Sequence, residues 1–86
     1  MALRFIGIDP NTGTGESPTV WVDETKLDLV LQGWEDEATT EEAGAFTVPG
    51  HAVGVPEGEA VIRIPARMVP MIREACDVIE QRAQLR

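Results

Sequence analysis

Few residues in this chain could act as nucleophiles, bases or metal ligands. It has one histidine, His51, one cysteine, Cys76, and no tyrosine. His51 lies in a glycine-rich stretch with no second histidine or cysteine nearby, which favours an ordinary surface histidine over a metal ligand or a base. Cys76 lies on an apolar helical face, where a thiol behaves as a small hydrophobe. The sequence therefore predicts no catalytic residue, no metal site, no cofactor and no enzymatic activity.

Asp9 is the one carboxylate whose position suggests catalysis. The run Ile6–Pro10 (IGIDP), followed by Thr12-Gly13, resembles the first strand of Holliday-junction resolvases of the RNase H-like fold. This resemblance implies a metal-dependent nuclease in which Asp9 binds a divalent cation. Such nucleases are longer, need further carboxylates and bind DNA through basic surfaces. The other interpretation is a turn-initiating Asp-Pro, and a second carboxylate beside Asp9, such as Asp23 or Asp28, would separate the two.

Acidic residues are concentrated in residues 35–42, where five of eight positions are acidic. The run lacks the alternating oxygen ligands and the glycine of a calcium loop. Acidic surfaces steer association with basic partners and can occupy the DNA-binding face of a regulator. We therefore predict a partner-binding surface, the alternative being a merely solvated face. The acidic residues of this predicted surface are Glu35, Asp36, Glu37, Glu41 and Glu42.

Two tryptophans accompany this surface in the prediction. Trp21 and Trp34 fall on a predicted hairpin, on the side opposite its leucines or near its end. Tryptophan is enriched at protein interfaces, although it also covers cores. We predict that both tryptophans are partner-binding anchors, the alternative being that they cover the core.

The elements that must position these residues follow from the periodicity of the chain. Strands are predicted over residues 3–8 and 59–64, and a hairpin over residues 19–24 and 26–34, turning around Thr25. On its second arm Leu27, Leu29 and Leu31 share the face expected to meet the core. Thr39 and Glu42 have the spacing of a capping box, which predicts a short helical turn. Glycines and prolines then predict a mobile loop over residues 43–58.

The most regular pattern lies at the C-terminal end. Apolar residues from Met68 to Ala83 recur at spacings of three and four, which predicts an amphipathic helix beginning between Arg67 and Pro70. The predicted fold is α+β, with a small antiparallel sheet of about four strands packed against this helix. With 86 residues, we expect a single domain over 1–86.

Charge and composition narrow the class of partner. Fifteen acidic and seven basic residues give a net charge of −8, and residues 1–60 hold twelve of the acidic residues. This charge disfavours direct binding of nucleic acid or of anionic membranes. The short apolar N-terminal run and the single cysteine favour a cytoplasmic protein.

A family resemblance adds to this interpretation. The segments Val20–Asp23 (VWVD), Leu29–Trp34 (LVLQGW) and Ala60–Pro70 (AVIRIPARMVP) resemble small acidic actinobacterial proteins encoded beside helix-turn-helix regulators and, more distantly, the BldB-like family. The resemblance implies a non-enzymatic accessory protein, antitoxin-like or a co-regulator in transcription, that forms a homodimer and modulates a basic DNA-binding regulator. A DNA-mimic protein, whose acidic surface would likewise bind a basic protein, is a further alternative.

Overall fold

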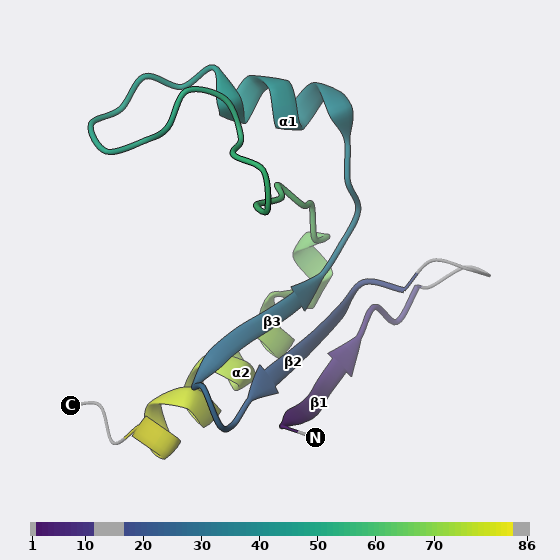
Figure 1. Ribbon diagram of the computed structural model, residues 1–86. Helices are drawn as coiled ribbons and strands as arrows, with labels where there is room; N and C mark the ends of the chain where they lie inside the picture. Colours follow the sequence, from purple (N-terminus) through teal and green to yellow (C-terminus); the bar gives the residue numbers. More distant parts are fainter. Residues whose placement is uncertain (1, 12–16, 84–86) are drawn as a thin grey trace. The chain divides into compact units, whose positions relative to one another are not determined.

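The computed structural model describes residues 2–11 and 17–83. The chain divides into two compact units: unit 1 comprises the chain up to residue 33 and from residue 64 onward, and unit 2 comprises residues 34–63. The elements are β1 (Leu3–Ile8), β2 (Thr19–Asp23), β3 (Asp28–Gln32), α1 (Glu37–Gly44), a 3-10 turn (Ala66–Met68) and α2 (Val69–Ala83) (Figure 1). The α+β class is confirmed, and the expected single domain over 1–86 stays a prediction.

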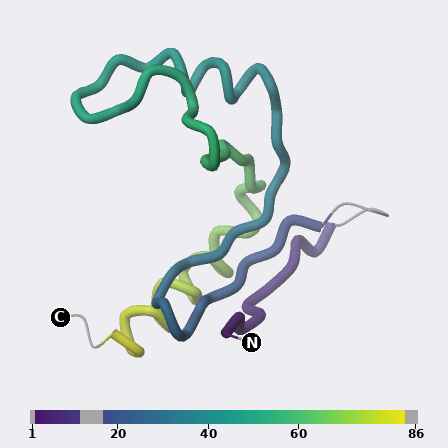
Figure 2. Tube along the Cα trace, in the orientation of Figure 1, coloured from purple at the N-terminus to yellow at the C-terminus, as the bar shows by residue number. Residues whose placement is uncertain are grey.

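The sheet of unit 1 is antiparallel, with the strand order β1-β2-β3, and the three strands run side by side in Figure 2. It contains three strands instead of the expected four or so. The run over residues 59–64 forms only a single bridge, between Arg63 and Trp34. Among the described residues, no strand of the sheet pairs with residues 59–62, and Pro65, which has no N–H, follows directly after Ile64.

The predicted hairpin is confirmed, with a shorter second arm. Its turn occupies residues 24–27, and the Asp23 carboxylate accepts hydrogen bonds from the backbone N–H groups of Thr25 and Lys26 at 2.9 and 2.8 Å. Leu27 belongs to this turn, at φ 61°, so its expected place on the strand was wrong. Trp34 was also misplaced, because β3 ends at Gln32.

One face of the sheet packs against α2, and the buried core lies between them. This core comprises Val20, Val22, Met68, Ala75 and Val78. Leu29 and Leu31 pair with Val22 and Val20 and therefore share the α2 side, but β3 is an edge strand and leaves them 41% and 38% exposed. The predicted helix is confirmed: Pro70 lies in its first turn, where a missing N–H costs little.

A β-bulge in β1 determines which residues after Phe5 face α2. Phe5 pairs with Trp21 and Gly7 pairs with Val20, so Ile6 is an extra residue in this strand. Gly7 is buried, and a Cβ at this position would lie 2.6 Å from Sδ and 2.9 Å from Cγ of Met71. Ordinary carbon contacts are about 3.5–4.0 Å, so only glycine fits here without displacing Met71.

We expect Gly7→Ala to destabilise the protein by about 1 kcal/mol, at the low end of overpacking costs, because the flexible, half-buried Met71 side chain can shift away from the added Cβ. Met71→Ala should relieve the clash, so the Gly7→Ala penalty should largely vanish in that background. A double-mutant cycle measured by urea unfolding gives this coupling. Equal penalties in both backgrounds would contradict the close contact.

Candidate functional site

The predicted acidic surface lies in unit 2, on the two residues before α1 and on α1 itself. Asp36 is the N-cap of this helix, and its carboxylate accepts hydrogen bonds from the backbone N–H of Thr39, at 3.1 Å, and from the Thr39 hydroxyl. The bond from the Thr39 hydroxyl is the main reason that the pKa of Asp36 is lowered, with smaller contributions from backbone N–H groups and Arg63. The helix therefore begins at Glu37, and the capping box predicted to start at Thr39 was wrong.

Arg63 is a residue of this region that the sequence interpretation missed. Its Nε donates to Oγ1 of Thr39 at 2.8 Å and lies 3.6 Å from Oδ2 of Asp36. Its backbone exchanges two hydrogen bonds with Trp34, of 3.0 and 2.8 Å. Asp36 is thus committed to capping and pairing within unit 2. A lone arginine in an apolar run gives no sequence signal for a partner 27 positions away.

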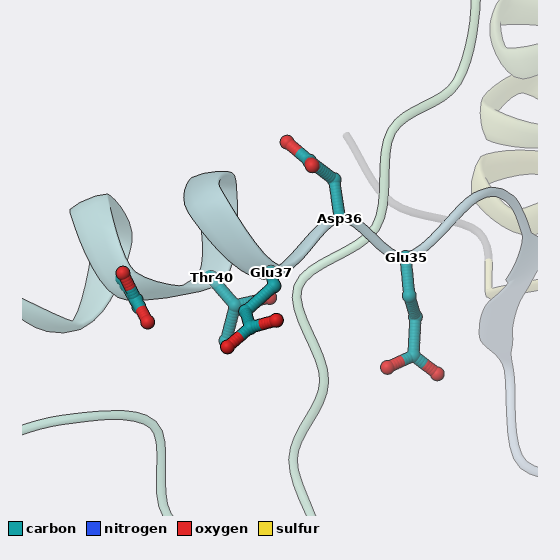
Figure 3. Close-up of a pocket in the computed structure, with 5 residues that line it drawn as sticks. Glu35, Asp36, Glu37 and Thr40 are labelled. Atoms are coloured by element: carbon teal, nitrogen blue, oxygen red, sulfur yellow. The ribbon is translucent and has the colours of Figure 1, made fainter.

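Three further carboxylates remain exposed on the same surface. Glu35, Glu37 and Glu41 line, with Asp36 and Thr40, a depression of about 390 Å³. In Figure 3, Glu35 and Glu37 extend to the side opposite Asp36. Within residues 2–11 and 17–83, no hydrogen bond or ion pair engages the carboxylates of these three glutamates or of Glu42. They leave negative charge available to a cation.

An adjoining depression of about 460 Å³ is mostly apolar. It shares Thr40 and Glu41 with the first one and is lined further by Gly44, Ala45 and the segment Val53–Val55. The segment Val53–Val55 is held against the end of α1 by a hydrogen bond from the Gly54 N–H to the Gly44 carbonyl, at 3.0 Å. A Cβ on Gly44 would lie 3.0 Å from the Gly54 Cα, so glycine permits this close approach. Acidic and apolar depressions therefore adjoin along one helix.

The structure divides the predicted partner-binding residues between the two units. Trp34 is half-buried at the start of unit 2, directly before the acidic residues. Trp21 belongs to unit 1, where it is half-buried in β2 on the face turned away from α2. The two tryptophans thus belong to different units, and Glu42 is exposed without lining the acidic depression.

Asp9 is buried, with 1% of its surface exposed. Its Oδ1 and Oδ2 accept hydrogen bonds from Nε and Nη2 of Arg67, at 2.6 and 2.7 Å, and Oδ1 also accepts from the Asn11 N–H at 3.0 Å. The Arg67 hydrogen bonds are the main cause of the lowered pKa of Asp9, against the opposing effect of burial, and Asn11 lowers it further. The same pairing raises the pKa of Arg67.

These contacts bear on the nuclease interpretation. Asp23 and Asp28 face each other at one end of the hairpin, opposite Leu3, whereas Asp9 follows Ile8 at the other end of β1. Among the residues placed by the structure, no group of three or more His, Cys, Asp or Glu could hold a metal. To bind a cation, Asp9 would have to release Arg67. Thr12 and Gly13, which belong to the resolvase-like pattern, lie outside the described residues.

Comparison with protein-family models, with curated proteins and with solved structures finds no match. Across the described segments, every helix is too short or too polar to cross a bilayer. The interpretation of the site therefore depends on its own geometry and charge.

Proposed function

We propose that this chain is a non-enzymatic interaction protein whose acidic surface on unit 2 binds a basic protein. An acidic surface that binds a basic protein suits an accessory or antitoxin-like modulator of a cytoplasmic DNA-binding regulator. The observation that carries the proposal is the group of exposed glutamates around one depression: Glu35, Glu37 and Glu41.

The two adjoining depressions suggest how such a partner is held. Lysine or arginine side chains of the partner would lie over the three glutamates, and an apolar side chain would enter the depression beside Gly44 and Val53–Val55. Complementary charge mainly raises the association rate, whereas the buried apolar contact mainly lowers the dissociation rate. The net charge of −8 extends the attraction beyond the contact itself. A regulator held in this way would present less of its basic face to DNA.

The test compares two baits of equal charge. One carries Glu35→Gln, Glu37→Gln and Glu41→Gln, and the control carries Glu74→Gln, Asp77→Asn and Glu80→Gln, three exposed acids of α2. We expect the wild type and the control to retain the same basic protein from source cells, and the first variant to lose it. The purified partner should then bind its DNA less tightly when the wild-type chain is added.

The kinetics of that complex give the quantitative check. Neutralising three contact charges should slow association by about tenfold at low salt and flatten its dependence on ionic strength. Equal association rates for the two charge-matched variants would show that the glutamates form only a solvated face. A partner that retains its full DNA affinity in the complex would contradict the regulatory role.

A further inference from the structure

The face of the sheet turned away from α2 carries a row of apolar residues across its middle. Phe5, Trp21 and Val30 form a cross-strand row over β1, β2 and β3. Leu3 and Ile8 lie on the same face of β1, and the exposed fractions of Phe5, Leu3 and Ile8 are 59%, 45% and 41%. We refer to these five residues as the outer face. Contiguous exposed apolar surface of this kind marks interaction sites in soluble proteins.

The only charged residues on this side of the three strands are acidic. Asp23 and Asp28 are directly opposite each other at the hairpin end, an arrangement that like charges disfavour. Asp23 is committed to the turn through Oδ1, whereas Asp28 is exposed, with no hydrogen bond or ion pair to its carboxylate in the described segments. Arg4 pairs with Val22, on the α2 side, and reaches Glu24. A cation on a partner would relieve the repulsion between the two aspartates.

The charge of the chain and the width of the outer face favour a different partner over a second copy. Three strands of five or six residues cover roughly 14 by 18 Å at ordinary strand spacing. Any partner held on this face alone would bury well under the approximately 1,200 Å² of a stable interface, which predicts a weak contact. A second copy is disfavoured because each copy carries a net charge of −8. A single α-helix is about 10–12 Å wide, and α2 shows on the other face that one helix spans these strands.

We propose that the outer face docks an amphipathic helix of a partner protein. The apolar stripe of that helix lies across Phe5, Trp21 and Val30, and a lysine or arginine near one end pairs with Asp28 and Asp23. This is the mode in which an apolar helix face fills a complementary surface. The proposal does not depend on the acidic surface of unit 2, because it uses other residues on another unit.

The probe is a synthetic amphipathic peptide with a leucine stripe and a lysine-bearing polar face, compared with a matched leucine–glutamate peptide. The full chain carries Glu35→Gln, Glu37→Gln, Glu41→Gln and Trp34→Phe, so that unit 2 attracts the peptide less and fluorescence reports Trp21 alone. We expect the lysine peptide to shift the Trp21 emission and the amide resonances of β1–β3. Asp28→Asn should reduce the preference for the lysine peptide over the glutamate peptide.

Phe5→Thr should weaken peptide binding by about tenfold or more, and Val30→Thr provides a second variant if Phe5→Thr does not fold. Phe46→Thr, at a position of unit 2 that is 58% exposed and lines neither of the two depressions, is the matched control and should bind normally. Unchanged binding by folded Phe5→Thr and Val30→Thr, or resonance shifts away from the sheet, would overturn the proposal. A wild-type dimer that Phe5→Thr dissociates in sedimentation would assign the face to a second copy instead.

Discussion

Arg67→Met is expected to destabilise the protein more than Asp9→Asn does, although the two substitutions break the same ion pair. The Asp9 side chain is 1% exposed and that of Arg67 is 41% exposed. Without the guanidinium, a buried carboxylate has only the Asn11 N–H as a partner, which is the costly way to break a buried pair. Without the carboxylate, Arg67 still reaches water, and an asparagine can still accept from Asn11.

The pH dependence of stability should separate the two variants further. Arg67 holds the pKa of Asp9 below its ordinary value, which is about 3.9. The pair therefore stabilises the wild type above about pH 4, and this contribution is lost as the pH falls through the lowered pKa. In Arg67→Met, the effect of burial should outweigh the remaining hydrogen bond from Asn11 and raise the pKa of Asp9. That variant should gain stability as the pH falls through the raised pKa, opposite in sign to the wild type.

Thermal unfolding from pH 3 to 8 would measure these effects. The double variant Asp9→Asn/Arg67→Met should melt above Arg67→Met at neutral pH, because no unpaired carboxylate remains. If Arg67→Met and Asp9→Asn melted at the same temperature with the same pH slope, the buried charge would not be the origin of the loss.

Met68→Ala is expected to cost about 2–5 kcal/mol of unfolding free energy. Met68 is the largest fully buried side chain among the described residues, and it packs with Val20, Val22 and Ala75 where the 3-10 turn meets α2. A small domain has only about 5–15 kcal/mol of total stability. The melting temperature should therefore fall by at least about 10 °C, as circular dichroism would measure.

Val69→Ala is the matched control, since it is the next residue along the chain and is 39% exposed. Surface substitutions of this kind change stability by about 0.5 kcal/mol or less. The α2 packing would be contradicted if Met68→Ala and Val69→Ala unfolded at the same urea concentration.

The hairpin and α2 were predictable because their patterns involve residues close together in the sequence. The hairpin has β-prone runs on both sides of Thr25, and α2 has apolar residues at helical spacing after Met68. The bulge at Ile6 was not, because it depends on how β1 meets β2. Strict alternation would place Asp9 on the same side as Phe5, whereas the extra residue turns Asp9 toward Arg67. The predicted strand over 59–64 failed because β-propensity does not supply a pairing partner.

The candidate site was predictable to a similar extent. The acidic composition identified residues 35–42, but their separate roles depend on contacts with residues far along the chain. Asp36 differs from Glu35 and Glu37 because Thr39 and Arg63 engage it. Of the outer face, only Trp21 was predicted from the sequence. Phe5 is exposed because α2 covers the opposite face of the sheet, and that depends on tertiary packing.

The bridge between Trp34 and Arg63 makes unit 2 an insertion, whose first and last residues are joined by two backbone hydrogen bonds. A segment whose two ends are held together can change length at little cost in stability, since doubling the length of a loop adds only about 0.6 kcal/mol of closure entropy. Residues 35–62 can therefore be exchanged or lengthened while β3 and α2 keep their places. The insertion is thus the part of the chain in which recognition of a new partner can arise without redesign of the sheet.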